Sequence, residues 1–175
     1  MLISDRDISL SVNDVPAQSC IDLLPYLDEK LETFAVCDAC GRPSIPELAM
    51  QLGPLSGRSL YRGSAERDYW AISPYLFSIT PQTLSWLDEN LTGEPWGYFI
   101  QSTVDFEKTS RHLRRFLTVL SPNGEKLLFR FYDPRVILDF LKVSTSTERQ
   151  EFFGPVRSLF LPDTNHYRQL SLSEP

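Results

Sequence analysis

A dense hydrophobic run, Leu127–Tyr132, lies immediately before Asp133 and Pro134 in the sequence. An apolar and aromatic segment of this kind, with one charge at Arg130, is typical of a central strand that is covered on both faces. Asp133 can accept hydrogen bonds from a first helical turn, and proline suits the first helical position. The pattern therefore predicts a strand, a sharp turn and a helix. The expected apolar face of that helix carries Val136, Ile137, Phe140 and Leu141.

The first half of the chain alternates between helical and strand-like spacing. Apolar positions over residues 17–31 predict a helix, which Pro25 is expected to kink or split. A short strand is predicted at residues 33–38, and a helix is predicted over Ser44–Leu52. Further strand candidates are residues 58–61 and 69–77, with a turn-rich segment between them.

A second amphipathic helix is predicted to begin at Pro81. Leu84, Leu87 and Leu91 recur at helical spacing and define its buried face. Trp86 lies roughly 200° around the helix from Leu84, because each residue turns a helix by about 100°. We therefore expect Trp86 to point away from the core unless a neighbouring element covers it.

The remaining elements complete the predicted order. Asn-Gly at residues 123–124, between apolar stretches at 117–120 and 126–132, predicts a β-hairpin. Thr145 and Glu148 have the spacing of a capping box at the start of the last helix. The other predicted elements are a strand at 96–102, a helix at 104–117 and a strand at 156–161.

This order of elements predicts the α/β (α+β) class. We expect a single domain with a mixed β-sheet flanked by helices, because hairpin-like steps alternate with crossovers. The domain is predicted to span residues 15–161. Residues 1–14 are predicted to form a flexible N-terminal arm, and residues 162–175 a polar tail.

Composition narrows the possible functions. The chain has 175 residues, 42% of them hydrophobic, and a formal net charge of −6, which disfavours general binding to nucleic acid. The sequence holds no apolar run long enough to insert into a membrane, and the N-terminus is acidic where a signal peptide would be basic. Three cysteines suit a reducing compartment better than a disulfide framework. Together these features predict a cytoplasmic protein.

Candidate catalytic and metal-binding motifs are weak. Cys37 and Cys40 have the C-x-x-C spacing of a thiol-redox pair, but Gly41-Arg42-Pro43 delays the next helix, so its dipole would not activate Cys37. A zinc site would need two more ligands, and no second paired spacing supplies them. No common nucleophile or phosphate-binding motif is present. We therefore expect no catalytic residues, no metal and no cofactor.

Two sets of charged residues remain as candidates. Arg111, Arg114 and Arg115 gather on the polar side of the helix at 104–117, where they could bind a partner together with Trp86 or form a solvated face. The second set surrounds the predicted turn, and we expect it to stabilise the turn because unpaired buried charge is costly. Its members are Arg130, Asp133, Pro134 and Arg135.

Several short blocks in the chain have a specific order and spacing. They are FAVCDA (34–39), SLYRG (59–63), ISPYL (72–76), WGYFIQS (96–102), HLRRF (112–116), LFRFYDPRV (128–136) and FFGPV (152–156). From about residue 34 to residue 161, these blocks resemble the effector adaptor, or effector chaperone, family of bacterial type VI secretion.

The resemblance implies a non-enzymatic cytoplasmic protein. Such an adaptor binds a cognate toxin effector and helps to load it onto the valine-glycine-repeat spike protein, VgrG. Two other functions remain open on the sequence: a structural or assembly subunit of the secretion apparatus, and a C-x-x-C thiol-redox enzyme.

Overall fold

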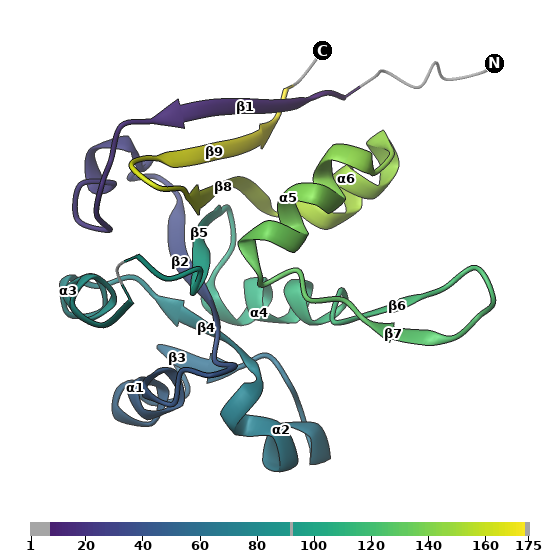
Figure 1. Cartoon of the computed structure of the whole chain (residues 1–175), viewed down its shortest axis with the longest axis horizontal. Coiled ribbons are helices and arrows are strands. Elements are labelled where there is room, and N and C mark those ends of the chain that lie inside the picture. The colour runs from purple at the N-terminus through teal and green to yellow at the C-terminus, as the bar shows by residue number, and fades with distance from the viewer. Residues whose placement is uncertain (1–7, 92, 174–175) are drawn as a thin grey trace.

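The computed structural model describes residues 8–91 and 93–173. A seven-stranded sheet with the order β1-β9-β8-β5-β2-β4-β3 forms its centre, and all the ladders between these strands are antiparallel (Figure 1). The strands are β1 (Leu10–Val15), β2 (Glu32–Asp38), β3 (Gly57–Ser59), β4 (Pro74–Ser78), β5 (Gly97–Ser102), β8 (Val156–Pro162) and β9 (Tyr167–Leu172). The predicted single α+β domain is confirmed, although the sheet is antiparallel where a mixture of strand directions was expected.

Helices cover both faces of this sheet. They are α1 (Ser44–Leu52), α2 (Ser64–Tyr69), α3 (Pro81–Leu91), α4 (Phe106–Arg114), α5 (Pro134–Val143) and α6 (Ser146–Phe153). In Figure 1, α1 and α3 lie on one side of the central strands, and α4, α5 and α6 lie on the other. Two short 3₁₀ turns, η1 (Leu24–Tyr26) and η2 (Trp70–Ile72), complete the described elements. No helix among these residues is long and apolar enough to cross a membrane.

The core consists of two hydrophobic clusters, one on each face of the sheet. Successive side chains of a strand point to opposite faces, and β2 shows this directly. Ala35 and Cys37 join the first cluster, with α1 and α3, while Phe34 and Val36 join the second, with α4, α5 and α6. Strands β4, β5 and β8 divide their side chains in the same way. The central strands are therefore buried on both faces.

Two helix starts follow the predicted capping chemistry. The Asp133 side chain accepts from the backbone N–H of Arg135 at 2.9 Å, and Pro134 is the first residue of α5. Thr145 and Glu148 form a complete capping box at the start of α6. These caps depend on neighbouring residues only, which is why the local sequence predicts them.

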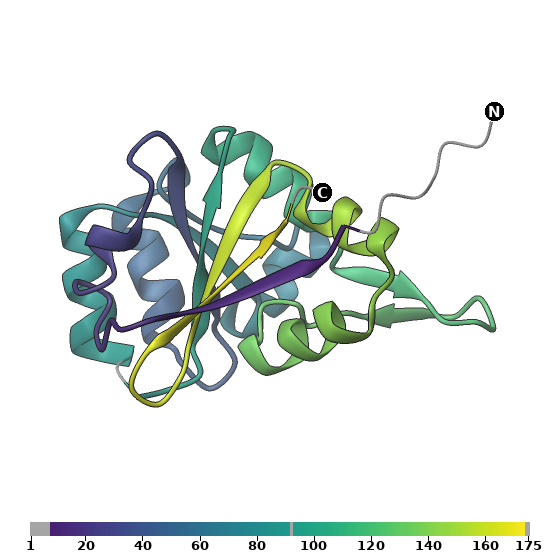
Figure 2. The same ribbon diagram turned by 90° about the horizontal axis from the view of Figure 1, so that it is seen from above.

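The run Leu127–Tyr132 is not a central strand, so that prediction is wrong. Its first part belongs to β7 (Lys126–Leu128), which pairs with β6 (Thr118–Leu120) in a hairpin that projects from the body of the molecule (Figures 1 and 2). All side chains of β6 and β7 are exposed. Phe131 and Tyr132 lie beyond the hairpin and are buried in the second cluster. The apolar run therefore divides between an exposed hairpin and a buried turn.

Both ends of the domain differ from the prediction of a flexible arm at residues 1–14 and a polar tail at 162–175. Residues 1–7 and 174–175 lie outside the described residues. Within the described part, Leu10 of β1 pairs with Leu172 of β9, and β9 pairs with β8. Alternating apolar side chains such as Leu170, which is fully buried, attach the end of the chain to the sheet. The sheet therefore includes part of both segments, through β1 and β9.

Two internal segments also differ from the prediction. Residues 17–31 form turns and η1 instead of a kinked helix, although Ala17, Cys20 and Leu23 still pack into the first cluster. Pro25 has no N–H to donate within a helix, which limits regular structure there. The segment after residue 61, predicted as a turn, contains α2. Because of this helix, the strand that follows, β4, is shorter than the predicted strand at 69–77.

Candidate functional site

An aspartate–arginine junction connects the end of β2 to the turn before α5. Asp38, 3% exposed, accepts a hydrogen bond from Nη2 of Arg130 at 2.7 Å. The other carboxylate oxygen of Asp38 accepts from the backbone N–H of Cys40 at 3.0 Å. Because the Asp38 carboxylate is buried, the Arg130 charge compensates for its lost hydration. The contact therefore ties two segments that are 92 positions apart in sequence.

Asp133 extends this network on the other side of the turn. Its carboxylate accepts from Arg135 through Nε at 3.0 Å and Nη2 at 2.7 Å, and Nη2 of Arg130 lies 4.0 Å away. Burial opposes the charged form of Asp133, but the bonds from the Arg135 side chain and backbone, with the charges of Arg135 and Arg130, lower its pKa overall. Arg130, Asp133 and Arg135 thus compensate one another, in an arrangement suited to holding the turn.

The arginines of α4 do not form one uniform surface. Arg111 is exposed, and its Nη2 lies 3.8 Å from Glu107 one turn earlier. Arg115 is exposed beyond the end of the helix, and its guanidinium lies 5.9 Å from the centre of the Phe116 ring. Arg114 is half-buried between them. The structure therefore separates the predicted group into two solvated side chains and one inward-facing guanidinium.

Arg114 belongs to a cluster of arginines, only part of which was predicted from the sequence. We define the arginine cluster as Arg58, Arg62, Arg111 and Arg114. Nη1 of Arg58 contacts Glu107 at 2.6 Å, and Arg62 approaches the same carboxylate at 4.0 Å. Burial, then repulsion from Arg62 and Arg58, lowers the pKa of Arg114. Nε and Nη2 of Arg114 are buried and have no hydrogen-bond partner among residues 8–91 and 93–173.

An open groove lies beside this cluster, between α2–η2 and the base of the β6–β7 hairpin. Its volume is about 460 Å³. We call it the hairpin groove, and its main lining residues are Tyr61, Arg62, Tyr69, Ile72, Leu117 and Leu128. Tyr69 and Ile72 were not predicted as surface residues, because their segment was predicted as a strand. The charge of Arg62, in a segment predicted as a turn, was the signal in the sequence that could have indicated a functional surface here.

Trp86 lies in a different place from these features. It is half-buried and packs against the first cluster, and its backbone carbonyl accepts from the Asn90 side chain at 2.8 Å. The predicted buried face of Leu84, Leu87 and Leu91 is confirmed. Apolar residues of the first cluster cover part of the Trp86 ring, which is the exception allowed in the expectation that this side chain points away from the core. The structure does not bring Trp86 together with the arginine cluster.

The cysteines are placed differently from a redox pair. Cys37 is fully buried, whereas Cys40 is exposed. Burial, reinforced by Cys20 and Asp38, raises the pKa of the Cys37 thiol well above its ordinary value. A thiol that stays protonated is a poor nucleophile.

A thiol-labelling experiment is expected to separate the cysteines. In the native chain Cys40 should react rapidly with Ellman's reagent, so about one thiol per chain is fast, and Cys20 and Cys37 should react only after unfolding. Cys40→Ser is the control, since it should remove the fast phase without changing the melting temperature. Rapid labelling of Cys37 in the folded chain would contradict this arrangement.

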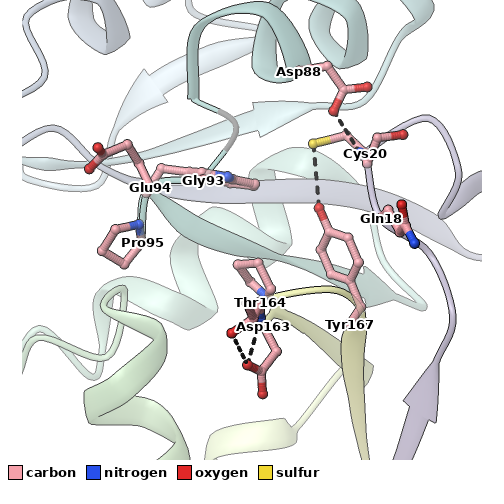
Figure 3. Close-up of a pocket in the computed structure, with 12 residues that line it drawn as sticks. Gln18, Cys20, Asp88, Gly93, Glu94, Pro95, Asp163, Thr164 and Tyr167 are labelled. Carbon is pink, nitrogen blue, oxygen red and sulfur yellow. Dashed lines mark hydrogen bonds between the residues drawn. The ribbon is translucent and has the colours of Figure 1, made fainter.

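A second cavity, of about 420 Å³, lies between the N-terminal segment, the loop after α3 and the turn joining β8 to β9 (Figure 3). Asp88 accepts from the backbone N–H of Cys20 at 2.7 Å, and the Cys20 sulfur lies 3.6 Å from the Tyr167 hydroxyl. Burial raises the pKa of Cys20 to about 12. These polar groups bond to one another, so they join the N-terminal segment to α3 and β9.

Metal binding and histidine chemistry receive no support from the geometry. Among residues 8–91 and 93–173, no group of three or more His, Cys, Asp or Glu side chains could hold a metal ion. Nε2 of His112 lies 2.7 Å from the carbonyl oxygen of Phe152. Burial outweighs this contact and, with Arg115, lowers the pKa of His112. A neutral ring donates from Nε2 to the carbonyl, so His112 connects α4 to α6.

The fold and the site define a single-domain α+β protein with an apolar groove next to an arginine cluster. The chain belongs to the family described as "Domain of unknown function (DUF4123)", whose model matches residues 33–151. No curated protein and no solved structure matches the chain. The matched region runs from β2 into α6, so it contains the aspartate–arginine junction, the arginine cluster and the hairpin groove.

Proposed function

We propose that this chain is a non-enzymatic adaptor that binds a cognate toxin effector of bacterial type VI secretion in the cytoplasm and helps to load it onto the VgrG spike protein. The sequence blocks that resemble the effector adaptor family support the proposal. The structural observation that carries it is the exposed apolar surface of the β6–β7 hairpin and the neighbouring η2 turn.

The hairpin exposes several large apolar side chains to solvent. Leu120 is 69% exposed and Leu128 is 57% exposed, and Val119 and Leu127 are exposed with them. Across the groove, Tyr69, Trp70 and Ile72 are exposed as well. Contiguous apolar surface is unusual on a monomer and marks sites of protein interaction. None of these exposed side chains belongs to either core cluster of the described residues.

The polar surroundings favour a protein partner over a small reactive substrate. Aromatic residues and arginine dominate the energetics of protein interfaces, and the groove brings both together. A redox function would need a reactive thiolate, and the raised pKa of the buried Cys37 thiol works against one. An adaptor requires shape and complementary charge only.

The test of this proposal is complex formation. The purified full chain is mixed with the toxin encoded beside it and, separately, with the spike protein encoded there. We expect a stable complex with the toxin by size-exclusion chromatography with light scattering, and loss of toxin secretion when the adaptor gene is deleted. An unrelated type VI toxin is the control.

Two results would contradict the proposal. One is a toxin that stays separate from the chain and is secreted normally without it. The other is disulfide reduction by the isolated chain in an insulin turnover assay, which would favour the redox function.

A further inference from the structure

We propose that the hairpin groove binds a segment of the partner polypeptide in which an apolar side chain stands beside a carboxylate. This inference rests on the proposed function and names the surface and the chemistry of recognition. It follows from two independent properties of the groove, its apolar walls and the surplus of positive charge at its rim.

The apolar walls come from two elements that do not close on each other. Leu117 and Leu128 lie at the base of the hairpin, and Tyr69 and Ile72 lie on the opposite side. Tyr69 is 55% exposed and Ile72 is 49% exposed, so each has surface left to bury. A leucine-sized side chain that entered the groove would remove this surface and its own from water. The walls therefore select an apolar side chain.

The rim carries more positive than negative charge. The cluster has four arginines, and the carboxylates that interact with it are Glu107 and Glu66. Glu107 is shared among Arg58, Arg62 and Arg111. Nearby, Asp68 of α2 is paired with Arg67 at 2.9 Å and supplies no net charge. This local surplus contrasts with the net charge of −6 of the chain, and Arg62 brings it to the groove.

Arg114 explains why extra negative charge is expected beside Arg62. Its buried Nε and Nη2 atoms are without a hydrogen-bond partner in the described part of the chain. A buried, unsatisfied guanidinium is costly, and a nearby carboxylate offsets its charge without contacting it. Arg62 lines the groove and is also among the charges that act on Arg114. A partner carboxylate at the rim would therefore pair with Arg62 and reduce the repulsion that Arg62 exerts on Arg114.

The same observations favour polypeptide over nucleic acid. Arginine and tyrosine can bind a single strand of nucleic acid, and Tyr61 and Tyr69 offer stacking surface in the groove, but the groove is also lined by aliphatic side chains, which do not stack with bases. The net charge of the whole chain also repels a phosphate backbone. An acidic, apolar peptide satisfies both the walls and the rim.

The first experiment uses two synthetic peptides and the ¹⁵N-labelled full chain. In one peptide leucine alternates with glutamate, and in the matched peptide lysine replaces glutamate. We expect the glutamate peptide to shift amide signals of Tyr69, Ile72, Leu117 and Leu128, and the lysine peptide to leave them in place. Equal binding of the lysine peptide, shifts confined to other surfaces, or binding of a single-stranded oligonucleotide in the groove would overturn the inference.

The second experiment uses variants on the exposed surface. Leu128→Asp and Arg62→Glu are expected to weaken binding of the glutamate peptide and of the toxin by about tenfold or more. Val143→Asp is the matched control, because Val143 is 83% exposed but does not line the groove. Circular dichroism checks that each variant folds, and Arg62→Glu keeps the test decisive if the hairpin variant does not.

The outcomes distinguish this inference from the proposed function. If the toxin binds the wild-type chain and both groove variants equally well, the groove is not its site, while the adaptor function stands. If the toxin does not bind the wild-type chain at all, the adaptor function fails. In that case the peptide titration alone tests the inference that the groove binds a peptide. Peptide binding that both groove variants lose supports the inference, and an absence of peptide binding overturns it.

Discussion

Replacement of Gly97 by alanine is expected to prevent the domain from folding. Gly97 begins β5, with φ at +147°, and it pairs with Cys37 of the neighbouring strand β2. A Cβ atom there would overlap the carbonyl oxygen of Val36 and lie 3.0 Å from Cα of Cys37. Both obstacles are backbone atoms in the centre of the sheet, so they cannot move aside without breaking the ladder. The expected loss is about 4 kcal/mol or more in the free energy of unfolding.

Gly124 provides the matched control for this substitution. It also has a positive φ, +80°, but open space surrounds the position of its Cβ. Gly124→Ala should therefore show only the conformational cost of the hairpin turn, about 1–2 kcal/mol. Urea unfolding followed by circular dichroism measures both variants. A Gly97→Ala protein as stable as Gly124→Ala would contradict the close approach of β2 and β5.

Asp133→Ala is expected to lower the free energy of unfolding by about 1–3 kcal/mol. Asp133 is 3% exposed, caps α5 and accepts from Arg135 through both carboxylate oxygens. Removing its carboxylate leaves the first turn of α5 without its cap. Arg130 and Arg135 also lose part of the negative charge that balances theirs. Thermal or urea unfolding at neutral pH measures the loss.

The pH dependence of this loss has a definite sign. The pKa of Asp133 is lower in the folded chain than its ordinary unfolded value of about 3.9. Its contribution is therefore fully present above about pH 4 and is lost as the pH falls through the folded pKa. The gap in stability between wild type and Asp133→Ala should narrow in acid. A gap that stays constant with pH would show that charge is not the source of the effect.

Asp105→Ala is the control that separates capping from burial. Asp105 also caps a helix, accepting from the backbone N–H of Lys108 at 2.9 Å, but its side chain is exposed. Its loss should therefore destabilise the domain less than loss of Asp133. If Asp133→Ala loses binding to the toxin while its unfolding curve matches wild type, and Asp105→Ala keeps binding, the turn contacts the partner instead of stabilising the fold.

The elements that sequence reasoning predicted well are those specified by near neighbours. Asp133 and Pro134 mark the start of α5, and Thr145 with Glu148 marks the start of α6. The predicted strand at 33–38 corresponds to β2, because a short run rich in apolar residues between turn signals has few other arrangements. Local chemistry was sufficient in each case.

The run Leu127–Tyr132 shows where such reasoning fails. Hydrophobicity indicates that a side chain should be buried, but it does not say whether the chain's own core or another molecule buries it. Leu127 and Leu128 remain exposed in the hairpin, and Phe131 is buried in the second cluster. The apolar run predicted all of these residues as parts of one strand. The exposed part became visible only when the tertiary structure showed that no other element covers it within the described residues.

The candidate site was predicted only in part, for a similar reason. Arg114 was identified from its helix face, but Arg58 and Arg62 come from a distant segment that tertiary contacts bring to Glu107. Asp38 and Arg130 meet across 92 positions of sequence. Helical spacing alone also left open whether a neighbouring element covers Trp86, and residues of the first cluster pack against it. Contacts between distant segments carry no short-range signal.

The pairing of β1 with β9 has a consequence for how the protein is made. Leu10 lies opposite Leu172, so β1 must wait for the synthesis of β9 before it can pair. Contacts this distant along the chain slow folding, because the entropy of closing a long loop is lost before the contact forms. During synthesis β1 stays an unpaired strand while the inner strands assemble. The completed sheet is therefore expected only once β9 has left the ribosome, and a nascent chain stalled before β9 should expose β1 to proteases and chaperones.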